Sequence, residues 1–298
     1  MQNLFKIIFL LCYVTPVLGK TNIVHLLQTQ DVETLKLTVD QIIDPNANQE
    51  EVRASIASMS AEVIKAVGPG ATSLEKFNAL RKYLYTKGPW NNYKPFQYDF
   101  THPYGIDLRN KTLAVYLKTK KGNCVSMPIL FLILAKKIGL DVTLSTAPVH
   151  LFVQFTDDGS GVSYNVETTN GASFARAQWM IKQLKITPRA IDHGTYLQPL
   201  TEKETSATIV ALLGEYLLQE GRFTESVEVF ESILSVYPKS VYAMVKAGSA
   251  YYKMIEKIRS KKVRGSLTSV DKQRLKLYFQ KNRAHFRKAD FYGWIPLP

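Results

Sequence analysis

The spacing of hydrophobic and polar residues predicts several helices in this chain. The clearest follows an N-cap at Thr72 or Ser73, where apolar residues recur at steps of three, three and four: Leu74, Phe77, Leu80 and Leu84. A weaker helical pattern covers residues 23–66, and another covers residues 174–186. The unbroken apolar run at residues 129–135 predicts a further helix.

Between residues 149 and 168 the pattern changes to that of a β-hairpin, with two apolar segments around a turn rich in Asp, Gly and Ser. Pairing Phe155 with Val162 would place His150 directly opposite Glu167. Side chains on a strand alternate between the two faces, so this register puts the histidine and the carboxylate on one face of the sheet.

Candidate chemistry begins at Cys124, which we place in the first turn of the helix that contains residues 129–135. The positive end of the helix dipole and unpaired N–H groups favour a thiolate there, and the thiolate is the nucleophilic form of cysteine. The alternative is that Cys124 is a small buried hydrophobic residue.

Taken together, Cys124, His150 and Glu167 form the residue set of a nucleophilic triad, in which a base held by a third group activates the nucleophile. Asn165 lies on the same face of the predicted hairpin, and it is the alternative to Glu167 as the group that orients the imidazole.

Three blocks around these residues resemble the core of the transglutaminase-like superfamily: residues 122–126, 148–152 and 166–171. The resemblance is greatest to the SirB-type branch, in which a helix-opening G-x-[C/P]-x-S block is followed by P-G-H-F and I-D-P-x-N-G blocks. It extends over roughly residues 25–175.

This resemblance implies that Cys124 is the nucleophile, His150 the base and Glu167 the orienting acid. It also implies an α+β fold of the papain/transglutaminase type, in which the helix that carries the cysteine packs on an antiparallel sheet. No cofactor or metal ion is expected. Two positions depart from the family pattern, because Glu167 stands where Asp is usual and Val149 where Gly is usual.

A second pattern begins at Ser206 and resembles the 34-residue tetratricopeptide repeat. Residues 241–259 look like the first helix of a second repeat, and residues 270–288 like its partner. Such helix pairs do not bury their apolar faces alone, so we expect them to pack on the catalytic domain and to bind protein partners. The first repeat rests on Leu213, Gly214, Leu217, Gly221, Phe223, Ser226, Phe230, Leu234 and Pro238.

These patterns divide the chain into three predicted parts. Residues 1–19 form a signal peptide, and residues 20–198 a transglutaminase-like domain with a helical N-terminal part at 20–70 and a core at 71–180. Residues 199–298 form the tetratricopeptide-like helical region, which ends in a basic segment.

The signal peptide is predicted because Lys6 precedes a short apolar core and Pro16 precedes a Val-Leu-Gly sequence. The apolar run is shorter than the ~20 residues that span a membrane, which favours cleavage near Gly19 over an uncleaved anchor. Cleavage leaves Cys124 as the only cysteine, so no intramolecular disulfide forms. We expect an exported protein, periplasmic or extracellular, that associates with the membrane surface.

The composition, with 46% hydrophobic and 21% charged residues among 298, is that of an ordinary globular protein. The net charge of +13 is uneven, because residues 253–290 carry 13 Lys or Arg against three Asp or Glu. This basic segment favours an anionic surface of the cell envelope, such as phospholipid headgroups, over nucleic acid. The alternative is a solvated helix face.

Two segments of the chain are rich in aromatic residues. Residues 90–104 line either a substrate groove or the core, and residues 291–298 are expected to dock back onto the fold.

The function hypothesis is therefore an enzyme that cleaves or transfers an amide bond of a protein or peptide through a thioester on Cys124. Hydrolysis makes it a cysteine peptidase or amidase, and transfer to an amine makes it a transglutaminase. We expect the Cys124 backbone N–H to stabilise the oxyanion. The alternative is a non-catalytic transglutaminase-like and tetratricopeptide scaffold in the cell envelope, motivated by Val149 and Glu167.

Overall fold

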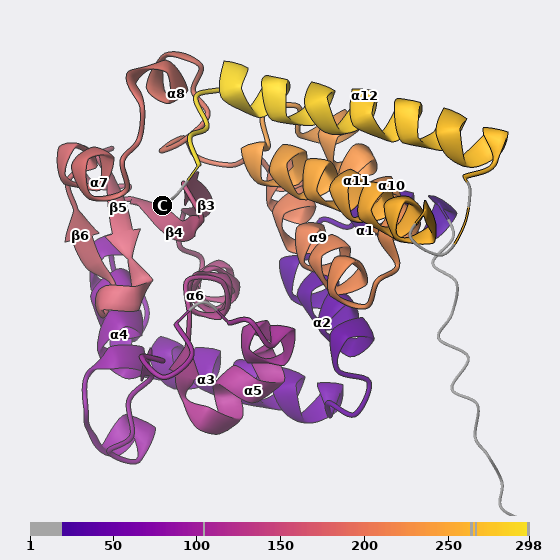
Figure 1. The fold of residues 1–298 in the computed structure, drawn as a ribbon. Coiled ribbons are helices and arrows are strands. Elements are labelled where there is room, and N and C mark those ends of the chain that lie inside the picture. The colour runs from indigo at the N-terminus through magenta and orange to yellow at the C-terminus, as the bar shows by residue number, and fades with distance from the viewer. Residues whose placement is uncertain (1–19, 104, 263–264, 266, 297–298) are drawn as a thin grey trace, which may run out of the picture.

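The computed structural model describes residues 20–103, 105–262, 265 and 267–296 (Figure 1). The predicted signal peptide lies outside the described residues. None of the helices described is both long and apolar enough to cross a bilayer.

The first part of the chain is helical, as the periodicity predicted. Four helices precede the aromatic stretch: α1 (Lys20–Gln28), α2 (Val32–Ile43), α3 (Gln49–Val67) and α4 (Ser73–Tyr85). Thr72 caps α4 in a capping box with Glu75, and Phe77, Leu80 and Leu84 are fully buried. Leu74 is 41% exposed, contrary to the prediction, because it lies in the first turn of α4 at the edge of the buried face.

Short elements connect these helices to the centre of the molecule. The 3-10 helix η1 (Pro89–Asn91) precedes β1 (Gln97–Tyr98), which pairs in parallel with β2 (Lys121–Gly122). Between these strands lie η2 (Leu108–Lys111) and α5 (Leu113–Thr119). The apolar run becomes α6 (Ser126–Lys137), buried from residue 126 to residue 135 and packed against both the helices and the main sheet.

The main sheet is antiparallel, in the order β3 (Val142–Ala147), β4 (His150–Thr156), β5 (Ser163–Glu167) and β6 (Ser173–Ala175). η3 (Thr168–Asn170) links the last two strands, and α7 (Ala177–Gln183) and α8 (Pro188–Asp192) follow. The single helix predicted over residues 174–186 is wrong at its start, because Ser173–Ala175 pairs with β5 instead.

The register of the β4–β5 hairpin differs from the prediction by two residues. Phe155 pairs with Tyr164, not with Val162, so His150 does not stand directly opposite Glu167. A shift of two residues leaves every side chain on its predicted face, since the period of a strand is two. His150 and Glu167 therefore still share a face, as diagonal neighbours.

The C-terminal part consists of long helices: α9 (Glu202–Gln219), α10 (Phe223–Val236), α11 (Val241–Lys262) and α12 (Ser269–Phe291). Figure 1 shows them stacked on one side of the molecule, with the sheet and α4 on the other. α1 and α2 pack against α9, so one hydrophobic core extends from Ile23 to Ala247 and includes both sides of residue 198.

Glycine allows close packing within this helical part. A β-carbon at Gly214 of α9 would lie 2.7 Å from the Phe230 ring of α10, and the Ser226 hydroxyl donates to the Gly214 carbonyl oxygen.

The C-terminal tail docks back as expected, because Thr187 Oγ1 donates to the Gly293 carbonyl oxygen and Trp294 packs on Phe286.

Together these elements give a mixed helical and sheet architecture, consistent with a transglutaminase-like α+β fold. A small antiparallel sheet packs on a buried central helix, and helices cover both.

Candidate active site

The sequence analysis placed Cys124 in the first turn of α6. In the structure, Cys124 lies in the turn just before this helix. The helix begins at Ser126, and its N-cap residue, Val125, makes no side-chain capping hydrogen bond. Asn123 Oδ1 accepts hydrogen bonds from the backbone N–H of Val125 at 3.0 Å and of Ser126 at 3.2 Å. The Asn123 side chain therefore fixes the turn that holds the thiol next to the helix N-terminus.

Gly122 and Asn123 fix the position of this turn. A β-carbon at Gly122 would lie 2.5 Å from the Tyr116 ring, so only glycine fits there. Asn123 is buried and its Nδ2 donates to the Asn110 carbonyl oxygen at 3.0 Å. The sequence analysis did not assign Asn123 a role, although an Asn whose side chain bonds the backbone two residues on is a common turn signal.

His150 and Glu167 meet across the sheet. His150 Nε2 lies 2.7 Å from Glu167 Oε2, and both side chains are largely buried. Glu167 Oε1 accepts a hydrogen bond from Thr169 Oγ1 at 2.8 Å, so both carboxylate oxygens are engaged. Thr169, which the sequence analysis overlooked, therefore holds the acid in place.

Burial lowers the pKa of His150, but hydrogen bonds to Cys124 and Glu167, with the negative charges of both, outweigh it and raise the pKa to about 10. The imidazole is therefore protonated over the neutral range. An imidazolium beside a sulfur atom stabilises the thiolate. Since Nε2 faces Glu167, Nδ1 is the ring nitrogen left for Cys124.

Asn165 does not contact His150. Its Oδ1 accepts from Gln154 Nε2 at 2.8 Å, and Gln154 is its direct partner in the β4–β5 ladder. Of the two groups considered from sequence, the structure brings Glu167 and not Asn165 to the histidine.

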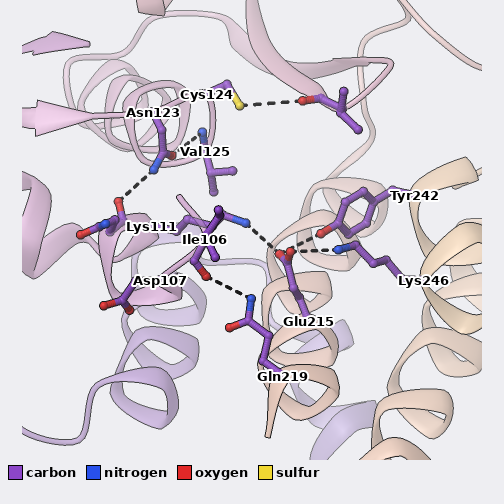
Figure 2. Close-up of polar contacts among 12 residues, drawn as sticks. Ile106, Asp107, Lys111, Asn123, Cys124, Val125, Glu215, Gln219, Tyr242 and Lys246 are labelled. Atoms are coloured by element: carbon purple, nitrogen blue, oxygen red, sulfur yellow. Dashed lines mark hydrogen bonds and ion pairs between the residues drawn. The ribbon is translucent and has the colours of Figure 1, made fainter. Parts of the chain in front are cut away.

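Val149 occupies the turn between β3 and β4 with a φ of +48°. A β-branched residue rarely adopts this left-handed conformation, whereas glycine does so freely, which gives a physical reason for the glycine of the family pattern. The Val149 carbonyl oxygen lies 3.9 Å from Cys124 Sγ, so the turn still reaches the thiol (Figure 2).

Cys124 and His150 open onto a cavity of about 730 Å³. Its walls come from three parts of the chain: the aromatic stretch, with Tyr98 and Phe100; the turns that carry Cys124 and His150; and the C-terminal part, with Tyr242 and Trp294. A larger cavity of about 1150 Å³ lies between α1, α9 and α10, and none of the three triad residues lines it.

A polar cluster on the wall of the first cavity also escaped the sequence analysis (Figure 2). Glu215 of α9 accepts from Lys111 Nζ at 2.9 Å, Lys246 Nζ at 3.0 Å and the Tyr242 hydroxyl at 2.8 Å. The one available signal was a glutamate inside the apolar stretch of residues 209–218, which is unusual on a buried helix face.

The profile of the transglutaminase-like superfamily matches residues 50–209. A UPF0162 protein of Buchnera aphidicola subsp. Baizongia pistaciae (strain Bp) is 25% identical over 138 residues, which are 45% of this chain and 50% of that protein. The chain thus spans about half the length of this curated relative.

Among solved structures, a crystal structure of menin that reveals the binding site for Mixed Lineage Leukemia (MLL) protein aligns with 93% of this chain and 71% of menin. The TM-score is 0.44 and the identity 14%. The superfamily profile covers more than half of the residues of this chain, so the chain belongs to the transglutaminase-like superfamily.

Proposed function

We propose that this protein is a cysteine enzyme that breaks an amide bond of a protein or peptide through a thioester on Cys124. His150 is the proton carrier and Glu167 holds its ring. The observation that carries the proposal is the 2.7 Å contact between His150 and Glu167, beside a cysteine in a turn fixed by the Asn123 side chain.

The first step follows from this geometry. The Cys124 thiolate attacks the amide carbonyl carbon, and the electron pair of the C=O bond moves to the oxygen. The backbone N–H of Cys124, which has no acceptor among the described residues, is available to donate to that oxyanion. The C–N bond then breaks as His150 gives its proton to the leaving amine, which leaves a thioester on the sulfur.

The thioester is resolved by a second nucleophile. Neutral His150 accepts a proton from water or from an amine, and the attack on the thioester carbonyl releases the thiolate. Water gives a peptidase or amidase, and an amine gives a transglutaminase. We favour hydrolysis, since water reaches an open cavity more readily than a protein amine does.

The proposal is tested by the rate at which iodoacetamide labels Cys124, followed by mass spectrometry at pH 5.5. We expect labelling at least about tenfold faster than that of glutathione, because an adjacent imidazolium favours the nucleophilic form of a cysteine. His150→Ala should remove most of this advantage, whereas His102→Ala, which alters an exposed histidine outside the site, should not. Equal rates for protein and glutathione would refute the enzyme proposal.

The second candidate is a non-catalytic scaffold, which the backbone at Val149 favours, because a strained valine replaces the glycine of the family pattern beside the thiol. In this reading the chain is a SirB-type relative whose tetratricopeptide-like hairpins, α9–α10 and α11–α12, bind a protein partner. Slow labelling of Cys124, together with capture of a partner by the C-terminal helices, would favour it.

We further propose that the chain is exported and that its basic segment, residues 253–290, holds it at an anionic envelope surface. The leader-like pattern of residues 1–19 and the excess of Lys and Arg in this segment support this location.

A further inference from the structure

The cavity beside Cys124 has a strongly positive wall. Four lysines line it against one acidic residue, Glu215. Lys111 and Lys246 lie within the polar cluster, and Lys185 and Lys239 lie at exposed positions. The lysines thus give the cavity an excess of positive charge, although apolar and aromatic side chains form most of its surface; the charge of His150 is paired with Glu167.

Glu215 does not neutralise its two lysine partners. One carboxylate accepts from Lys111 Nζ at 2.9 Å and from Lys246 Nζ at 3.0 Å, so the cluster keeps one positive charge. Burial raises the pKa of Glu215, but the charges of the two lysines outweigh it and lower the pKa to about 2, so the carboxylate is ionised. Each ammonium has three N–H donors, and among the described residues only one from each has an acceptor.

The cluster and the thiol face one cavity. Figure 2 shows Cys124 on one side, with Glu215, Tyr242 and Lys246 across from it. Burial, then the charge and hydrogen bond of Glu215, raise the pKa of Tyr242, so its hydroxyl stays protonated and donates to the carboxylate. A ligand that reaches Cys124 therefore also lies near unused ammonium donors.

We propose that Lys246, assisted by Lys111, binds a carboxylate of the substrate, so that the enzyme selects amide bonds close to an acidic group. The Lys246 side chain is 27% exposed, which leaves it accessible to a ligand, and Glu215 and the Tyr242 ring hold its ammonium in place. The substrate role rests on the proposed function, whereas the carboxylate site itself does not. The alternative is a cluster that only ties η2 to α9 and α11.

Alkylating dipeptides test the site without knowledge of the natural substrate. Iodoacetyl-Gly-Glu-amide and iodoacetyl-Gly-Gln-amide differ only by one charge, and both alkylate Cys124 of the full-length protein. The measured quantity is the ratio of the alkylation rates of the Glu and Gln reagents. We expect this ratio to be about tenfold higher for Cys124 than for glutathione, because the carboxylate of the Glu reagent pairs with a partly buried ammonium. High salt should reduce this ratio.

Lys246→Gln should abolish the preference, and Lys246→Arg should retain it. Lys257→Gln, on the exposed face of α11, is the matched control and should leave the ratio unchanged. Thermal unfolding of each variant checks that it is folded. A third reagent, iodoacetyl-Gly-Gln with a free C-terminal carboxylate, distinguishes a side-chain carboxylate from a terminal one as the preferred group.

The two proposals fail in different ways. Fast labelling by the Gln reagent with no preference for Glu would overturn the carboxylate site and leave the enzyme proposal standing. Slow labelling by both reagents would argue against the enzyme proposal, while their ratio would still decide the carboxylate site. A preference that survives Lys246→Gln would also overturn the site as assigned.

Discussion

At the scale of single residues, the hydrogen bond between His150 and Glu167 determines how the imidazole is oriented. We predict that Glu167→Gln slows iodoacetamide labelling of Cys124 at pH 5.5 severalfold, because the amide has no charge with which to stabilise the imidazolium. Asn165→Ala should leave the rate unchanged, since Asn165 contacts Gln154 and not the histidine. The opposite result would assign the orienting role to Asn165.

A second prediction at the residue scale concerns Glu215 and the pH dependence of stability. Its folded-state pKa of about 2 lies below the ordinary value of 4.5, so its stabilising effect is complete above about pH 4.5 and is lost as the pH falls towards 2. Over this whole range the loss is about 3 kcal/mol. In urea unfolding, wild type should therefore lose about 1 kcal/mol more than Glu215→Gln between pH 6 and pH 3.5.

The control for this measurement is Glu220→Gln, at the exposed end of the same helix, whose pH dependence should match that of wild type. Parallel pH profiles for wild type and Glu215→Gln would show that the two lysines do not stabilise the ionised form of Glu215.

At the scale of elements, the α9–α10 hairpin depends on the absence of a side chain at Gly214. Gly214→Ala should lower the free energy of unfolding by about 1–3 kcal/mol, because its β-carbon would lie 2.7 Å from the fully buried Phe230 ring. The clash outweighs the gain of about 1 kcal/mol that alanine brings to a helix. Chemical denaturation measures the change, and Glu228→Ala on the exposed face of α10 is the control. A more stable Gly214→Ala protein would contradict this packing.

At the scale of the whole molecule, we propose that the basic segment holds the protein at an anionic surface. α11 packs beside α12 (Figure 1), which brings the exposed Lys257 of α11 to the same helix pair as the exposed Lys272, Arg274 and Lys276 of α12. Protein in a pelleted envelope fraction should be released by roughly 1 M salt without detergent, since the Debye length falls from ~10 Å at ~0.1 M to ~3 Å.

Four neutralising substitutions in this segment should abolish pelleting at low salt, because they remove exposed charges from both helices: Lys257→Gln, Lys272→Gln, Arg274→Gln and Lys276→Gln. The matched control removes four exposed charges elsewhere and should still pellet: Lys65→Gln, Lys87→Gln, Lys94→Gln and Lys118→Gln. Retention in high salt would instead indicate a hydrophobic anchor.

What the sequence alone determined is local. The helical period predicted α4 and its cap, the apolar run predicted α6, and the alternating hairpin placed His150 and Glu167 on one face. These features follow from the geometry of a helix or strand over a few residues, so they remain correct even when an element boundary or a strand register is predicted wrongly. The two-residue error in the β4–β5 register shows this, because it changed the cross-strand partner of every residue but left every side chain on its predicted face of the sheet.

Only the tertiary structure decided which distant groups meet. Leu74 proved exposed and residues 173–175 joined the sheet, because packing against neighbours overrides local pattern. One wall of the cavity at Cys124 comes from helices more than 80 residues further along the chain, and Lys111 pairs with Glu215 across 104 residues. No period or spacing encodes such a pair, since it depends on how whole elements pack and on which charges that packing buries together.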